Sequence, residues 1–147
     1  MENLSVISEV KLVYKRALEL SKMPKVLSSE DVVNILKDCF DPETMDLSVS
    51  FKVMLLSPKK NVIGILNVLG DDLSVKVRLI MQGALISNSD RIIIAHNHPD
   101  GDLTIKALDD CITKQVQKAC EIMGIELLDH IILTSESYYS YADKMRL

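Results

Sequence analysis

The sequence lacks any stretch approaching the roughly 20 consecutive apolar residues that a membrane-spanning helix requires. Its first ten residues, MENLSVISEV, also lack the basic region followed by an apolar run that marks a secretory signal. Both absences argue against a membrane protein and against a secreted one. We therefore expect a cytoplasmic protein without a targeting segment.

Cysteine is scarce, and its spacing does not suit cross-links. None of the three cysteines belongs to a CxxC pair, and Cys111 and Cys120 lie nine residues apart in one helical pattern. At about 1.5 Å of rise per residue, that spacing exceeds the reach of a disulfide. We expect reduced thiols.

An excess of positive charge is also missing. The net charge is −4 and the isoelectric point is near 5.3, which argues against a broad nucleic-acid footprint. A solvated helix face explains the one local basic run at least as well as a nucleic-acid patch does. The run comprises Lys11, Lys15, Arg16, Lys22 and Lys25.

The chain does have the size and apolar content of one folded domain. Its 147 residues are 48% apolar and 26% charged, enough for a substantial core. Periodicity and turn signals predict the order helix, helix, strand, strand, helix, strand, helix, strand, strand. The predicted elements fall at residues 7–20, from 28, 50–56, 61–69, 78–85, 92–95, from about 104, 126–134 and 138–141. This order predicts an α/β fold, a mixed sheet covered by helices.

The first two predicted helices form an amino-terminal flank, residues 1–41, and residues 42–147 form the main domain. The flank is either a small subdomain or a cover for the main sheet. Residues 41–46 are the plausible linker between the two parts.

The stretch RIIIAHNHPDGDLTIKALD, residues 91–109, carries the chemistry. A short β-branched run ends at His96-Asn97-His98-Pro99, and side chains two apart on a strand point to the same side. Asn97 should face away. The following helix can bring Asp109 back toward both rings, and two imidazoles with a carboxylate are typical ligands of an open, catalytic zinc site. The alternative is a solvated loop pair, which is common for His-x-His.

These residues resemble the JAB/MPN (JAMM) zinc metallopeptidase motif, and HNHPDG is similar to the HNHPSG signature of its RadC-like branch. Residues 56–64 (LSPKKNVIG) and 128–134 (LDHIILT) also resemble RadC segments, so the likeness covers about two thirds of the chain. It implies a three-layer fold similar to that of cytidine deaminases. It also implies zinc-dependent amide hydrolysis, in which a Glu transfers the proton and a Ser holds the water or the oxyanion. RadC relatives carry a DNA-repair name, which the acidic composition supports little.

The chain departs from the family pattern at both catalytic partners. The family Glu falls on Val49 and the family Ser falls on Lys106. Lys106 either leans outward into solvent, folds over the cluster and pairs with Asp109 in place of the metal, or acts as an oxyanion donor. Five acids might replace the Glu, but we expect each to be an ordinary solvated loop residue. We expect His130 to be a satisfied core or edge histidine and not a fourth ligand. The acids are Asp46, Asp71, Asp72, Asp100 and Asp102.

Two hypotheses follow. The chain is either a RadC-like zinc hydrolase of impaired or altered activity on a peptide or protein, or a pseudoenzyme that uses the same fold for binding or scaffolding. A zinc nucleobase deaminase would need HxE followed by PCxxC, and the chain has neither. The residues predict neither the substrate nor the oligomeric state.

Overall fold

The computed structural model describes residues 7–68 and 75–147. Within them a five-stranded sheet has the order β2-β1-β3-β4-β5. Strands β3 and β4 are parallel, and the other neighbours are antiparallel. The strands are β1 (Phe51–Leu56), β2 (Val62–Asn67), β3 (Arg91–Asn97), β4 (Glu126–Leu133) and β5 (Tyr138–Ser140). The predicted mixed sheet is therefore confirmed.

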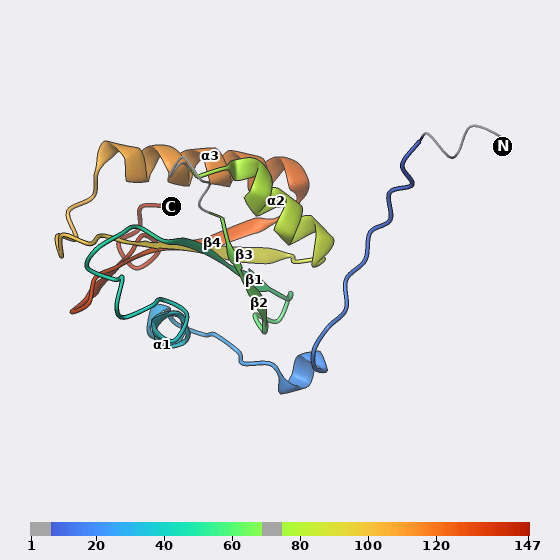
Figure 1. The fold of residues 1–147 in the computed structure, drawn as a ribbon, viewed down its shortest axis with the longest axis horizontal. Helices are drawn as coiled ribbons and strands as arrows, with labels where there is room; N and C mark the ends of the chain where they lie inside the picture. Colours follow the sequence, from blue (N-terminus) through green and yellow to red (C-terminus); the bar gives the residue numbers. More distant parts are fainter. Residues whose placement is uncertain (1–6, 69–74) are drawn as a thin grey trace.

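Helices cover both faces of this sheet, which gives three layers (Figure 1). Helices α2 (Val77–Ile86) and α3 (Ala107–Met123) lie on one face, and α1 (Ser29–Lys37) lies on the other. Strand β1 is buried along its whole length because it contributes to both layers. Val53 and Leu55 join the core under α2 and α3, whereas Met54 and Leu56 join the core under α1.

Local sequence signals explain where several elements begin and end. The Ser28 hydroxyl accepts the N–H of Asp31, and the Asp31 carboxylate accepts the N–H of Ser28, so a reciprocal cap starts α1 as predicted. Gly124 ends α3 in the left-handed conformation, with φ of 68°. Gly83 on α2 leaves room for Leu66 of β2, whose Cδ2 lies 2.3 Å from where a Cβ would stand. The predicted end of the second strand, at residue 69, lies outside the described residues.

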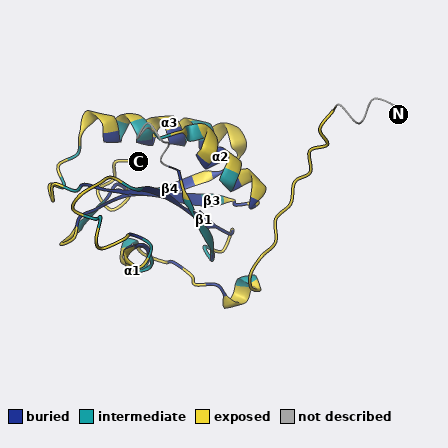
Figure 2. Cartoon of the chain, in the orientation of Figure 1, coloured by how far each residue is buried: buried dark blue, intermediate teal, exposed yellow. Residues whose placement is uncertain are grey.

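The predicted helix over residues 7–20 is wrong. Residues 7–19 form an extended, exposed segment that points away from the folded domain (Figures 1 and 2). Only a 3-10 turn, η1 (Leu20–Lys22), follows it. The apolar side chains of this segment find no packing partner among the described residues, since Val10 is 85% exposed and Val13 is 76% exposed. A short helix without a packed face is marginal in water. The flank therefore consists of α1, whose Val32, Val33 and Leu36 pack on the sheet, and the boundary at residue 41 stays a prediction.

The state of the cysteines agrees with the expectation of reduced thiols. Cys39, Cys111 and Cys120 are all free thiols. Among the described helices, none combines the length and the apolar character needed to cross a bilayer.

Candidate metal centre

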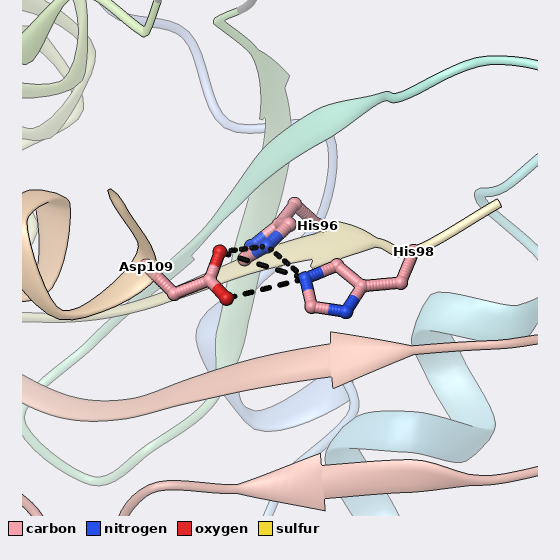
Figure 3. A group of neighbouring side chains, drawn as sticks. All are labelled: His96, His98 and Asp109. Carbon is pink, nitrogen blue, oxygen red and sulfur yellow. Dashed lines mark hydrogen bonds and ion pairs between the residues drawn. The ribbon is translucent and has the colours of Figure 1, made fainter. Parts of the chain in front are cut away.

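The predicted His-His-Asp cluster is assembled where β3 ends and α3 begins (Figure 3). Strand β3 lies between β1 and β4, and His96 pairs in register with Phe51 and Ile132. Its ring stacks on Phe51, with centroids 5.6 Å apart and planes 4° apart. Asp109 stands in the first turn of α3, where its carboxylate accepts the N–H of Lys106 at 2.8 Å. A buried strand and a helix thus fix the three groups.

The three side chains converge on one point. The Nε2 atoms of His96 and His98 lie 3.2 Å apart. The Asp109 carboxylate lies 3.0 Å from His96 Nε2 and 3.3 Å from His98 Nε2. All three residues are buried, and one candidate ligand atom from each lies within 4.8 Å of the others. The solvated-loop alternative for the histidine pair is therefore wrong.

The remaining hydrogen bonds assign the proton on His98. Its Nδ1 lies 2.7 Å from the backbone carbonyl oxygen of Asp102. A carbonyl oxygen only accepts, so Nδ1 must donate and Nε2 of the neutral ring carries a bare lone pair. That lone pair points into the cluster.

A chain of hydrogen bonds through His130 assigns the proton on His96. The Thr113 hydroxyl donates its one hydrogen to the backbone carbonyl oxygen of Asp109 at 2.7 Å. Because no second hydrogen is left, the hydroxyl oxygen must accept the hydrogen bond from His130 Nδ1 at 2.6 Å. Burial lowers the pKa of His130 well below its ordinary value, and the ring is neutral. His130 Nε2 is then an acceptor, and His96 Nδ1 donates to it at 2.9 Å. His96 therefore also turns a bare Nε2 into the cluster.

Two lone pairs and a carboxylate in contact repel each other unless a cation lies among them. Burial acts to raise the pKa of Asp109, but a hydrogen bond with His96, which needs a proton on its Nε2, and the hydrogen bond from the Lys106 N–H outweigh it and hold the pKa below its usual range. The carboxylate is thus ionised, and the cation is either a proton on one ring or a metal. Two neutral imidazoles and one carboxylate are a typical donor set for zinc and also for iron(II). The donor set fits the metal that the motif implies.

A cleft of about 770 Å³ opens beside the cluster. Strand β1, the loop before it, the start of α3 and Val75 form its walls, which are mainly apolar. The apolar side chains are Leu47, Val49, Phe51, Val75, Leu108 and Ile112. Val49, the family's Glu position, therefore stands in the wall next to the cluster and is 43% exposed.

Asn97 holds the loop that carries Val49. Its side-chain amide donates to the carbonyls of Met45 and Ser48 at 2.8 and 2.9 Å, and its oxygen accepts the N–H of Ser50 at 2.7 Å. As predicted, it does not join the His-His-Asp cluster. Its role as the anchor of the cleft wall was not visible in the sequence, because those partners lie about 50 residues earlier in the chain.

The side chain of Lys106 leans outward. Its Nζ lies 3.5 Å from Asp100, both side chains are more than half exposed, and such a pair contributes little stability. Only its backbone contacts Asp109: the Lys106 N–H donates to the Asp109 carboxylate, and the Lys106 carbonyl accepts the Asp109 N–H. The reading in which Lys106 pairs with Asp109 and replaces the metal is therefore wrong, although the residue still lines the cleft.

No described acid takes the place of the missing Glu. Asp46 is exposed and absent from the cleft wall, Asp100 pairs with Lys106, and Asp102 accepts the N–H of Thr104 at 2.8 Å. Asp71 and Asp72 lie outside the described residues. Among the residues that the structure describes, Asp109 is the only carboxylate lining the cleft.

His130 should control metal affinity from outside the cluster. In His130→Leu, the proton on His96 Nδ1 loses its acceptor, and we expect zinc affinity to fall by about 10- to 100-fold, the usual effect of losing such a partner. In His130→Gln, an amide oxygen and an amide N–H can replace the two ring contacts, so most of the affinity should remain. Competition with a chromogenic chelator measures both variants, and equal affinities would contradict the relay.

Stability of the metal-free protein should fall as the pH drops below about 6.5. Because burial lowers the pKa of His130, the unfolded chain binds a proton in this window while the folded chain does not. A group of this kind contributes up to about 1.4 kcal/mol of lost stability per pH unit below its unfolded pKa. Urea unfolding in EDTA at several pH values measures the slope, and His130→Gln should reduce it. An unchanged slope in that variant would exclude His130 as the source.

Comparison with known proteins places these features in a family. The family model described as "RadC-like JAB domain" matches residues 26–146. A UPF0758 protein of Thermotoga maritima is 34% identical over 132 residues, which cover 88% of this chain and 58% of the relative. UPF0758 proteins of Flavobacterium johnsoniae and Clostridium beijerinckii are 31% and 34% identical, over 88% and 82% of this chain and 57% and 52% of their own lengths. The chain thus spans little more than half of these curated relatives. With the fold and the cluster that its sequence predicts, the chain belongs to the RadC-like JAB domain family.

Proposed function

We propose that this domain binds one Zn²⁺ ion through His96, His98 and Asp109 and uses the adjoining cleft to bind polypeptide chains without cleaving them. The observation that carries the first half is the convergence of three buried groups. Both histidines direct Nε2 toward an ionised carboxylate, with 3.0 to 3.3 Å between each ring nitrogen and the carboxylate. An arrangement of this kind suits a metal better than it suits any internal hydrogen bond.

The second half rests on what lines the cleft. Zinc at this position would supply Lewis acidity toward a carbonyl group or a water molecule. Amide hydrolysis also needs a group that moves a proton from water to the leaving amine. Val49 stands where the family has that carboxylate, and Asp109 is committed to the cluster. Lacking a general base commonly costs about 10²- to 10⁴-fold in rate.

The proposal is tested on the purified full chain. Metal content is measured by mass spectrometry after EDTA treatment and after zinc is returned, and one ion per chain is expected. The zinc-loaded protein is then incubated with peptide and isopeptide substrates, and products are followed by mass spectrometry. Absence of bound zinc would overturn the metal assignment, and zinc-dependent cleavage that His96→Ala abolishes would overturn the non-hydrolytic assignment in favour of an active peptidase.

A further inference from the structure

The cleft beside the cluster has an unbalanced positive charge once a divalent ion is bound, so this inference rests on the proposed function. Among the described residues that line the cleft, Lys106 and Asp109 are the ones with a full charge at neutral pH when both histidines are neutral. The ion's two charges outweigh the one carboxylate even without the outward-leaning ammonium of Lys106. A net charge of at least one therefore faces a cavity with apolar walls, where water screens it less than at an open surface.

Among the residues that the structure describes, the cleft wall has no further acidic side chain to neutralise the ion. Asp100 pairs with Lys106, but that pair is exposed and Asp100 is not part of the cleft wall. Val49 presents an apolar side chain at the position where a carboxylate would balance the ion. The start of α3 adds positive character, because Lys106, Leu108 and Asp109 of its first turn all line the cleft. The described part of the wall thus leaves the ion's charge to be balanced by an anionic group of a ligand.

The walls define the rest of that ligand. Leu47 and Leu108 border the cleft with 79% and 77% of their surface exposed, so both can bury apolar area against a bound group. Gln115 and Ser48 add polar groups to the wall that suit peptide amides. We infer that the cleft captures the free carboxyl end of a polypeptide whose last residues are apolar. Amide hydrolysis releases a free carboxyl end of this kind as one of its two products. The domain thus binds a product of the reaction for which it lacks the general base.

The test compares two ligands that differ only at the carboxyl end. Acetyl-Gly-Gly-Leu-Leu is titrated into the zinc-loaded full chain by calorimetry, as the free acid and as the terminal amide. We expect the acid to bind at least about tenfold more tightly, because an uncompensated charge in a confined site is worth 1.4 kcal/mol or more. Removal of zinc with EDTA should abolish the preference. Equal binding of both peptides, or binding of neither, would overturn the inference.

Variants locate the binding site. Val49→Glu places a carboxylate in the wall and should weaken binding of the acid by about tenfold or more, whereas the neutral Val49→Gln, of similar shape, should weaken it clearly less. Lys106→Ser should weaken it by about two- to fivefold, as expected of an exposed charge, and Lys118→Ser on the exposed side of α3 should not. Octanoate is the competing acid, and displacement of the peptide by octanoate at equal concentration would contradict recognition of a polypeptide.

The zinc content of each sample is measured before the titration. It distinguishes failure of the proposed function from failure of the carboxyl-end inference. A chain without zinc overturns the proposed function itself. A chain that holds zinc and shows no preference for the acid, or the same affinity in Val49→Glu and Val49→Gln, overturns only the carboxyl-end inference.

Discussion

Replacing His96 by alanine should reduce bound zinc from one ion per chain to almost none at micromolar zinc. The change removes one of three converging ligands, and His98 and Asp109 alone are 3.3 Å apart on an otherwise open site. Loss of an outer partner such as His130 lowers metal affinity by up to about 100-fold. We expect the loss of a ligand itself to lower zinc affinity by more than this. Chelator competition and metal analysis after dialysis measure the loss, and His98→Ala and Asp109→Asn should behave alike.

The same substitution should leave the metal-free fold largely intact. Removing His96 Nε2 relieves the contact with His98 Nε2 at 3.2 Å, which partly offsets the stacking lost on Phe51.

Zinc binding should stabilise the original chain by about 2.7 kcal/mol at a zinc concentration of 100 times Kd, and it should not stabilise His96→Ala. Thermal unfolding with and without zinc measures the difference. A variant that still gains stability from zinc would show that the ion binds elsewhere.

The sequence predicted the cluster because its signals are local. Alternation along β3 puts His96 and His98 on one side, Pro99 takes the chain out of the sheet, and helical periodicity returns Asp109. Val49 lies two residues before Phe51, and the pairing of Phe51 with His96 places this part of the chain beside the cluster. Residues that share one register are thus predictable from spacing alone.

The support of the cluster was not predictable in this way. His130 contacts His96 because β4 pairs in parallel with β3, and the two residues are 34 positions apart. From the sequence, His130 was expected to be a satisfied core or edge residue, and its burial and its partners confirm the core position. The tautomer of His96, however, depends on a strand pairing that no short motif encodes. The helix expected at residues 7–20 failed for the opposite reason. Its periodicity is local, while the packing that would stabilise a helix there is absent from the described chain.

The double variant Val49→Glu, Lys106→Ser should gain zinc-dependent amide hydrolysis. It restores both residue types that the family motif has, at positions that line the cleft beside the cluster. The loop that carries residue 49 is held by three hydrogen bonds to Asn97, so a carboxylate there would start from a fixed backbone. A positioned base contributes about 10²- to 10⁴-fold, and we expect a rate increase in this range over the original chain. Release of amine from a peptide or isopeptide substrate measures it.

Single variants divide this gain between the two positions. Val49→Glu alone should gain less, because the ammonium of Lys106 can pair with the new carboxylate and lower its basicity. Val49→Gln with Lys106→Ser has the same shape without a titratable group, so it should remain at the original rate while binding the same amount of zinc. If the double variant holds zinc and stays as inactive as this control, then the loss of activity does not lie at Val49. The walls of the cleft would then have to exclude amide substrates by shape, and binding of the terminal amide of acetyl-Gly-Gly-Leu-Leu would be the property to measure next.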